Sequence, residues 1–224
     1  MANATEVVTR LDAAVAARKL LDHPFYKAWV AGELTTDDLR FYSTQYWQQV
    51  ESFPGYLSSL ADRLPESPAR KVVLENLSDE VNGDHKGLWL EFAKSVGATE
   101  AEVRETLPEP ETNECVARFS EGTDSRSLAF GLGMLYGYES QTPDVAKTKA
   151  QGLRELYGID GPGLDYFELH GELDVEHAGD LASAIAEIAS DEDALRDAEA
   201  GAMAGAEAIY GLLDGVARSR SICV

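Results

Sequence analysis

Basic residues are scarce in this sequence. Its 224 residues include 19 lysines and arginines against 40 aspartates and glutamates, so the formal net charge is −21. A chain this acidic repels nucleic acids and anionic membrane surfaces. We therefore expect neither nucleic acid nor a membrane among its partners, and we interpret most of the acidic side chains as a solvated surface.

Cysteines and long apolar runs are also few. Cys115 and Cys223 stand far apart, which excludes a disulfide framework and fits a reducing compartment. The first twenty residues mix charged with small apolar side chains and show no export signal. The longest weakly polar stretch, 128–138, is much shorter than the roughly 20 residues that span a bilayer. The sequence predicts a cytoplasmic protein.

Strand signals are missing, whereas apolar residues recur at helical spacing almost everywhere. We expect a single domain over residues 1–224, folded as an all-α, compact bundle of seven or eight helices. Thr35 and Asp38 predict a cap at the start of the second helical segment, and Pro54 is expected to kink that segment. The helical segments are 4–21, 35–64, 68–82, 84–96, 99–106, 112–121, 125–157, 163–189 and 191–218.

The strongest chemical signal is the spacing His170-x-x-x-Asp174-x-x-His177. On a helix these positions share one stripe, so two imidazoles and a carboxylate project to the same side. This mixture of ligands suits iron, manganese or zinc better than magnesium or calcium. The alternative is a polar helix face, because neighbouring glutamates make the segment acidic in any case.

Glu139 is a second candidate, because it follows a stretch of small and apolar residues typical of a buried core. A buried carboxylate needs a partner. Pro143 lies four residues later and removes the helical hydrogen bond to the Glu139 carbonyl, which is expected to bend the helix there. A carboxylate that simply faces water near the kink is the alternative.

Glu80 and His85 form the third candidate pair, at the end of one helical segment and the start of the next. In an unbroken helix they would point in different directions, so they can meet only if Asn82-Gly83 interrupts it. Asp79 or Asp84 could replace Glu80 as the carboxylate.

Together the three segments offer three histidines and three carboxylates on different helices, enough for two adjacent metal ions with positions open for dioxygen or substrate. The remaining histidine, His23, precedes Pro24 and is interpreted as a turn residue at a helix start.

Four parts of the sequence carry motifs of a known family. They are HPFYKAWVAGELTTDDLRFYSTQYWQQVESFPGYLS at 23–58, NLSDE with HKGLW and EFAKSVG, YGYESQTPDVAKTKAQGLRELYG at 136–158 and HGELDVEH at 170–177. These motifs resemble the haem-oxygenase-like di-metal oxidases with the TenA/PqqC-like fold, and within them the CADD-like folate-metabolism branch. By position, the resemblance implies that the metal ligands are Glu80, His85, Glu139, His170, Asp174 and His177. The interval between Glu80 and His85 is shorter than is usual in that branch, which leaves Asp79 as an alternative to Glu80.

The resemblance also implies a chemistry, namely synthesis of para-aminobenzoate for folate from a tyrosine of the protein itself. By position Tyr26 would supply the ring, Tyr138 would be a second redox-active tyrosine and Lys149 would donate the amino group. The cofactors would be two transition-metal ions, Fe/Fe or Mn/Fe, with dioxygen and an external reductant as cosubstrates. The sequence identifies no electron donor, and a homodimer is the candidate assembly. Without the resemblance, we would interpret Tyr26 as a core residue, Tyr138 as a hydrogen-bond donor next to the metal site and Lys149 as a solvated charge.

Three other functions compete with this one. A thiaminase-like relative would need Cys115 as a nucleophile, although the residues around it suggest no activating partner. A non-enzymatic helical module would leave the histidine and carboxylate set without a purpose. A di-metal oxidase acting on an external amino acid or fatty acid would use the same metal site but would not consume Tyr26 or Lys149.

Overall fold

The computed structural model describes residues 3–222, and over that range the chain folds into helices without a strand. The all-α prediction is confirmed. Within the same range, three short 3-10 segments connect some of the helices, namely Ala16–Arg18, Leu20–Asp22 and Gly161–Gly163. The α-helices of the described range are α1 (Ala4–Val15), α2 (Pro24–Ala31), α3 (Thr36–Arg63), α4 (Pro68–Asn82), α5 (His85–Ser95), α6 (Glu100–Glu105), α7 (Pro110–Asp124), α8 (Leu128–Glu139), α9 (Thr142–Glu155), α10 (Asp165–Ile188) and α11 (Glu192–Ser219).

Residues 3–222 form eleven α-helices, more than the seven or eight expected for the bundle and two more than the nine helical segments expected from the sequence. The two additional helices arise where one expected segment is divided and where the chain after His23 is helical. The segment 125–157 is interrupted: α8 ends at Glu139, and Pro143 lies in the first turn of α9, where its missing N–H does no harm. The chain after His23 forms the short helix α2. The predicted cap of α3 is present as a capping box of Thr35 and Asp38, and α3 continues through Pro54 as one helix.

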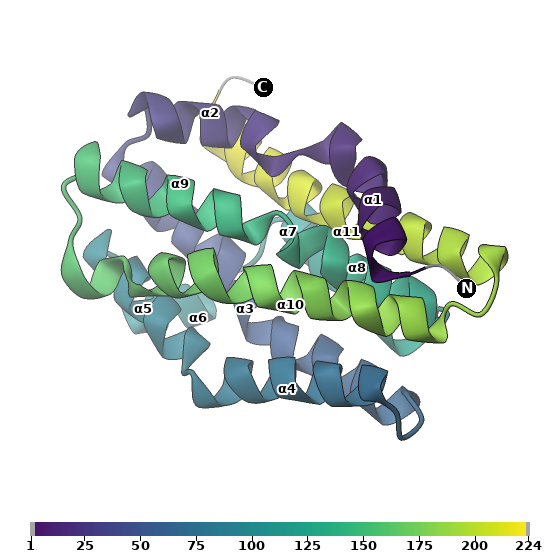
Figure 1. Ribbon diagram of the computed structural model, residues 1–224. Helices are drawn as coiled ribbons and strands as arrows, with labels where there is room; N and C mark the ends of the chain where they lie inside the picture. Colours follow the sequence, from purple (N-terminus) through teal and green to yellow (C-terminus); the bar gives the residue numbers. More distant parts are fainter. Residues whose placement is uncertain (1–2, 223–224) are drawn as a thin grey trace.

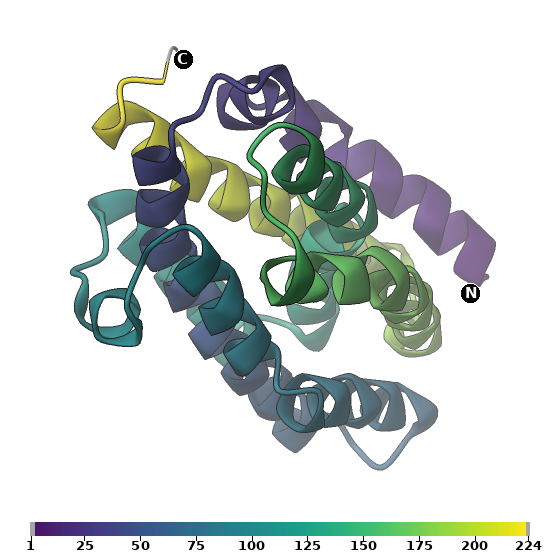
Figure 2. The same cartoon turned by 90° about the vertical axis from the view of Figure 1, so that its left-hand side faces the viewer.

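Helix α10 carries His170, Asp174 and His177 and contacts several neighbouring helices. Figure 1 shows it running between α9 and α4, and it packs against both as well as against α8 and α1. Figure 2 shows α5 lying along the long helix α3, with α4 beyond it. Side chains from α4, α5, α8 and α10 can therefore converge on one region of the interior.

The position of α8 depends on close contact with α11. A Cβ atom added to Gly137 would lie 2.1 Å from the backbone oxygen of Ala202, so only glycine permits this approach. Because Gly137 precedes Tyr138 and Glu139, the contact also sets the depth at which those two side chains enter the interior.

Aromatic residues fill the core between α2, α3, α5 and α10. The largest fully buried side chains include Trp29, Tyr26, Tyr42, Trp89 and Phe167. The rings of Trp29, Tyr42, Trp89 and Phe167 meet edge to face at centroid distances of 5.8 to 6.0 Å, within the range in which aromatic pairs attract.

Among residues 3–222, none of the helices combines the length and apolar character needed to cross a membrane.

Candidate metal centre

Helix α10 supplies three of the six predicted ligands. His170, Asp174 and His177 are all buried, with 3%, 2% and 5% of their surface exposed. Their spacing places them on one side of the helix, as the sequence predicted. Because His170 and Asp174 are about one turn apart, α10 can contribute to two neighbouring groups of ligands.

The first group joins Glu80 of α4, His85 of α5 and His170. His85 Nδ1 lies 2.9 Å from Glu80 Oε2, and His170 Nε2 lies 4.0 Å from Glu80 Oε1. The two imidazole rings meet edge to face with centroids 4.6 Å apart. One donor atom from each residue lies within 4.8 Å of the others, close enough for a single ion to bind all three.

The second group joins Glu139, at the end of α8, to Asp174 and His177. His177 Nδ1 lies 3.6 Å from Glu139 Oε1 and 3.5 Å from Asp174 Oδ1. Glu139 is 1% exposed, which excludes the alternative interpretation that its carboxylate simply faces water near a bend in the helix. The donor atoms of this group also lie within 4.8 Å of one another.

The approach of His85 to Glu80 depends on the break between α4 and α5. Helix α4 ends at Asn82, and Asp84 takes a left-handed conformation with φ of 51° as the cap of α5. A Cβ atom on Gly83 would lie 2.7 Å from His85 Nε2, so glycine leaves room for the imidazole. The interruption expected at Asn82-Gly83 is therefore present.

Hydrogen bonds on the outer side of two histidines orient their rings. His170 Nδ1 lies 2.6 Å from the backbone oxygen of Tyr166, which leaves Nε2 free to bind a metal. His177 Nε2 lies 3.3 Å from Asp79 Oδ2, which leaves Nδ1 free. Such partners hold ligand histidines in the correct tautomer and orientation.

The two groups have properties that a bound cation would explain. His85 Nδ1, His177 Nδ1 and Glu139 Oε2 are buried and have no hydrogen-bond partner within residues 3–222. The 2.9 Å approach of His85 to Glu80 lacks the angle of a hydrogen bond. Burial raises the pKa of Glu139 to about 7, and the neighbouring imidazole of His177 only partly opposes this shift. Within residues 3–222, neither lysine nor arginine forms an ion pair with any of the three carboxylates. Two buried carboxylate and histidine groups thus fit a di-metal site.

The structure favours Glu80 over Asp79 as the ligand, because Glu80 is buried in the first group whereas the Asp79 side chain is half exposed. We expect Glu80→Gln to lose one of two ions. Asp79→Asn should still bind two ions at saturation but hold the second one about 10-fold to 100-fold more weakly, since it removes only the partner of His177. Metal titration followed by elemental analysis measures both effects. Loss of an ion in Asp79→Asn, with both retained in Glu80→Gln, would reverse the assignment.

The predicted catalytic residues Tyr26 and Lys149 lie together. Lys149 Nζ is 5.1 Å from the centroid of the Tyr26 ring and donates a hydrogen bond of 2.6 Å to the hydroxyl of Tyr42. Lys149 is 4% exposed, so it is not the solvated charge that its residue type alone suggests. Burial lowers the pKa of Lys149 to about 7 and raises that of Tyr26.

Tyr46 connects this cluster with the metal side. Its ring centroid is 5.0 Å from Lys149 Nζ, and its hydroxyl lies 3.2 Å from that of Tyr138, the residue before Glu139. Neither Tyr42 nor Tyr46 stood out in the sequence, and nor did Asn76, whose Nδ2 donates to Glu139 Oε1 at 2.8 Å. The spacing Asn76-x-x-x-Glu80 on one helix face was the available signal.

Two other residues considered from the sequence, His23 and Cys115, lie outside the two ligand groups. His23 caps α2 by accepting a hydrogen bond from the Phe25 backbone, in agreement with its interpretation as a residue at a helix start. Cys115 is buried beside Gln49, and burial raises its thiol pKa, which opposes a nucleophilic role. Cys223 lies outside the described residues.

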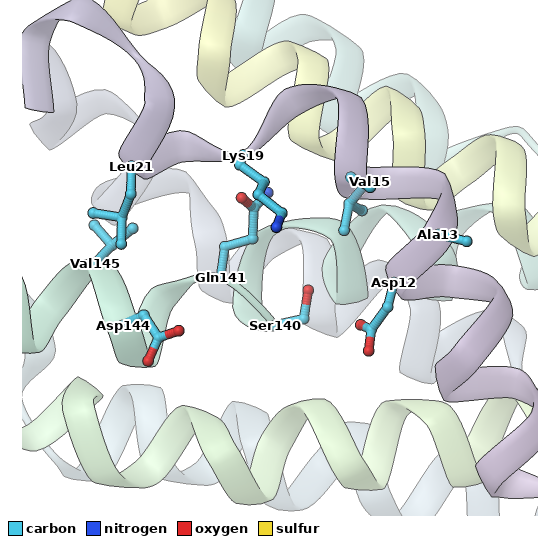
Figure 3. Close-up of a pocket in the computed structure, with 10 residues that line it drawn as sticks. Asp12, Ala13, Val15, Lys19, Leu21, Ser140, Gln141, Asp144 and Val145 are labelled. Carbon is cyan, nitrogen blue, oxygen red and sulfur yellow. The ribbon is translucent and has the colours of Figure 1, made fainter. Parts of the chain in front are cut away.

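A cavity of about 570 Å³ lies next to the α8–α9 connection but contains none of the six candidate ligands. Figure 3 shows side chains such as Asp12 and Lys19 on one wall, from α1 and the segment after it. Ser140, Gln141 and Asp144 form the other wall. The cavity therefore lies behind the backbone that follows Glu139.

Comparison with known proteins agrees with this geometry. Residues 40–210 match a family model described as iron-containing redox enzyme. A 4-aminobenzoate synthase of Chlamydia muridarum is 37% identical over 96% of this chain and 91% of its own, and one of Nitrosomonas europaea is 33% identical over 92% and 89%. A TenA homolog from Pseudomonas syringae has the same fold, with a TM-score of 0.83 at 15% identity over 96% of each chain. The chain thus belongs to the haem-oxygenase-like family of iron-containing redox enzymes and is an enzyme of the oxygenase type.

Proposed function

We propose that this enzyme forms 4-aminobenzoate from the side chain of its own Tyr26, with Lys149 as the nitrogen donor. The names of relatives at 33% and 37% identity support the product. The observation that carries the residue assignment is the placement of the Lys149 amine against the ring of Tyr26, in surroundings that leave both side chains almost inaccessible to solvent. A tethered tyrosine held in this way is an oxidisable group with a fixed position and little exposure to water.

The product defines what must happen to Tyr26. The six ring carbons and Cβ are kept, the bond between Cα and Cβ breaks, and Cβ is oxidised to a carboxylate. Nitrogen replaces the phenolic oxygen, which leaves as water, and the bond between Cε and Nζ of Lys149 must break to release that nitrogen. Two metal ions held by Glu80, His85, Glu139, His170, Asp174 and His177 would supply dioxygen activation, with electrons from an external reductant.

The chain's own residues prepare the nitrogen donor. Burial among the rings of Tyr26, Tyr42 and Tyr46 disfavours the charged form of Lys149 and makes an unprotonated amine available near neutral pH. The hydrogen bond to Tyr42 fixes the position of Nζ. The raised pKa of Tyr26 keeps its phenol protonated before reaction.

Isotope labelling tests whether the substrate is internal. Protein carrying ring-labelled tyrosine, loaded with metal and supplied with reductant and dioxygen, should release labelled 4-aminobenzoate in the presence of unlabelled free tyrosine. The yield should not exceed about one product per chain, because Tyr26 is consumed. Many turnovers, or unlabelled product, would indicate an external substrate and make Tyr26 part of the pocket wall, as in the alternative oxidase.

The pH dependence tests the state of Lys149. Only the neutral amine has a free electron pair, so the single-turnover rate should rise as the pH increases through about 7 and level off above it. Rapid mixing of reduced, metal-loaded protein with oxygenated buffer at a series of pH values gives this profile. A rate that falls as the pH rises through the same range would contradict the proposed role of the neutral amine.

A further inference from the structure

A second cavity links the metal centre with the surface. It has a volume of about 310 Å³ and lies between α4 and α10, on the outer side of the second ligand group. We call it the α4–α10 vestibule; its carboxylate wall consists of Glu75, Asp79, Glu176 and Asp180, and its inner end of Asn76 and His177.

The wall of the vestibule is strongly acidic. Four carboxylates line it, and Glu75 pairs with Lys71, whose Nζ is 3.2 Å away and largely exposed. Carboxylates around a concavity raise the local concentration of cations and accelerate their capture. Acidic residues alone do not show that a cation reaches the metal centre, so the residues at the inner end of the cavity must also be considered.

The inner end is built from buried polar residues that belong to the metal centre. Asn76 and His177 are 3% and 5% exposed, and in the described part of the chain Asn76 Oδ1 has no hydrogen-bond partner. Asn76 Nδ2 donates to Glu139 Oε1, and His177 directs Nδ1 toward Glu139 and Asp174. The vestibule therefore ends at the outer face of the second ligand group.

Asp79 connects the solvent-exposed wall of the vestibule with its buried inner end. Its side chain is half exposed at the surface, yet its Oδ2 lies 3.3 Å from Nε2 of the buried His177. A cation moving inward would meet oxygen ligands at each stage: the wall carboxylates, the free carbonyl oxygen of Asn76, and then Glu139 and Asp174. Successive oxygen ligands can replace the water molecules of a divalent ion one at a time.

We propose that the α4–α10 vestibule is the loading route by which a divalent transition-metal cation reaches the group formed by Glu139, Asp174 and His177. The inference rests on the metal centre of the proposed function. It assigns a role to three surface carboxylates, Glu75, Glu176 and Asp180, that are outside the ligand set.

The test is the rate of metal binding, measured without turnover. Cobalt(II), whose visible absorption changes on coordination by imidazole and carboxylate, is mixed with metal-free protein under anaerobic conditions. The triple variant Glu75→Gln, Glu176→Gln and Asp180→Asn should bind two ions at equilibrium, but the association rate of the second site should fall about tenfold and lose most of its salt dependence. Asp79 is left unchanged so that His177 keeps its partner.

A matched control removes the same number of charges from other helices. The exposed residues Asp37, Glu105 and Glu121 lie on α3, α6 and α7, and changing them to the corresponding amides should leave the association rate close to that of wild type. If the two triple variants had equal effects, the association rate would depend only on the net charge of the protein, and the proposed route would be wrong.

A steric variant tests passage itself. Val72 lines the vestibule, so Val72→Phe should narrow it and slow both cobalt uptake and its removal by a chelator, since both use the same path. Wild-type rates in Val72→Phe and in the vestibule triple variant would overturn the route while leaving the metal centre intact. Failure of the wild-type protein to bind cobalt would overturn the centre and the route together.

Discussion

Replacing Tyr26 by phenylalanine should abolish 4-aminobenzoate formation while the fold and both metal ions are retained. The change removes one hydroxyl from a side chain that is 1% exposed and is not among the candidate ligands. Without the phenolic oxygen, the ring carbon that must receive nitrogen is no longer activated. Product is measured by mass spectrometry after aerobic reaction with reductant, and bound metal by elemental analysis of the same sample.

Two comparisons make the Tyr26 result specific. Tyr56→Phe alters another buried tyrosine of the core and should leave the product yield unchanged. Lys149→Arg keeps a positive charge but removes the donor amine, so it should fail if nitrogen transfer is the role of Lys149 and survive better if the role is electrostatic. Product formation by Tyr26→Phe at the wild-type yield would contradict self-consumption of this residue.

Replacing Asp174 by alanine should remove at least one of two bound metal ions and lower product formation by more than about a hundredfold. The loss should exceed the 10-fold to 100-fold effect of outer hydrogen-bond partners, because a direct ligand is removed. Glu172→Ala, an exposed position on the same helix, should retain both ions. Wild-type protein that holds only traces of metal after anaerobic reconstitution with iron and manganese would contradict the di-metal site.

Thermal unfolding separates this effect from misfolding. In the metal-free protein the nearby charge of Asp174 helps to raise the pKa of Glu139, so the two buried carboxylates repel each other. Asp174 Oδ1 also lies 3.5 Å from His177 Nδ1 and helps to raise the pKa of that histidine, so the variant loses one attraction together with one repulsion. Metal-free Asp174→Ala should therefore melt close to metal-free wild type, while the increase in melting temperature on adding metal should be smaller. A large drop in the metal-free melting temperature would show that Asp174 stabilises the fold directly.

Local sequence patterns predicted much of the geometry of the candidate site. The spacing of His170, Asp174 and His177 encodes one face of a helix, because helical periodicity depends only on neighbouring residues. Asn82-Gly83 marked the interruption that lets His85 turn toward Glu80, and the apolar surroundings of Glu139 indicated its burial. The resemblance to known di-metal oxidases selected the same six positions, and the structure gathers them into two groups.

Other features depended on contacts between distant segments. The choice between Glu80 and Asp79 follows from the direction in which α4 faces α10. The surroundings of Lys149 follow from the packing of α9 against α2 and α10, together with the hydrogen bond from Lys149 to Tyr42 of α3.

The sequence by itself thus determined the helical class and which residues can share a helix face, since both follow from the spacing of side chains along the chain. Only the tertiary structure decided that Lys149 is buried against Tyr26 and that an acidic vestibule ends at His177. Burial depends on which surfaces of separate helices meet, and in this protein that is set by close contacts such as the one between Gly137 and Ala202.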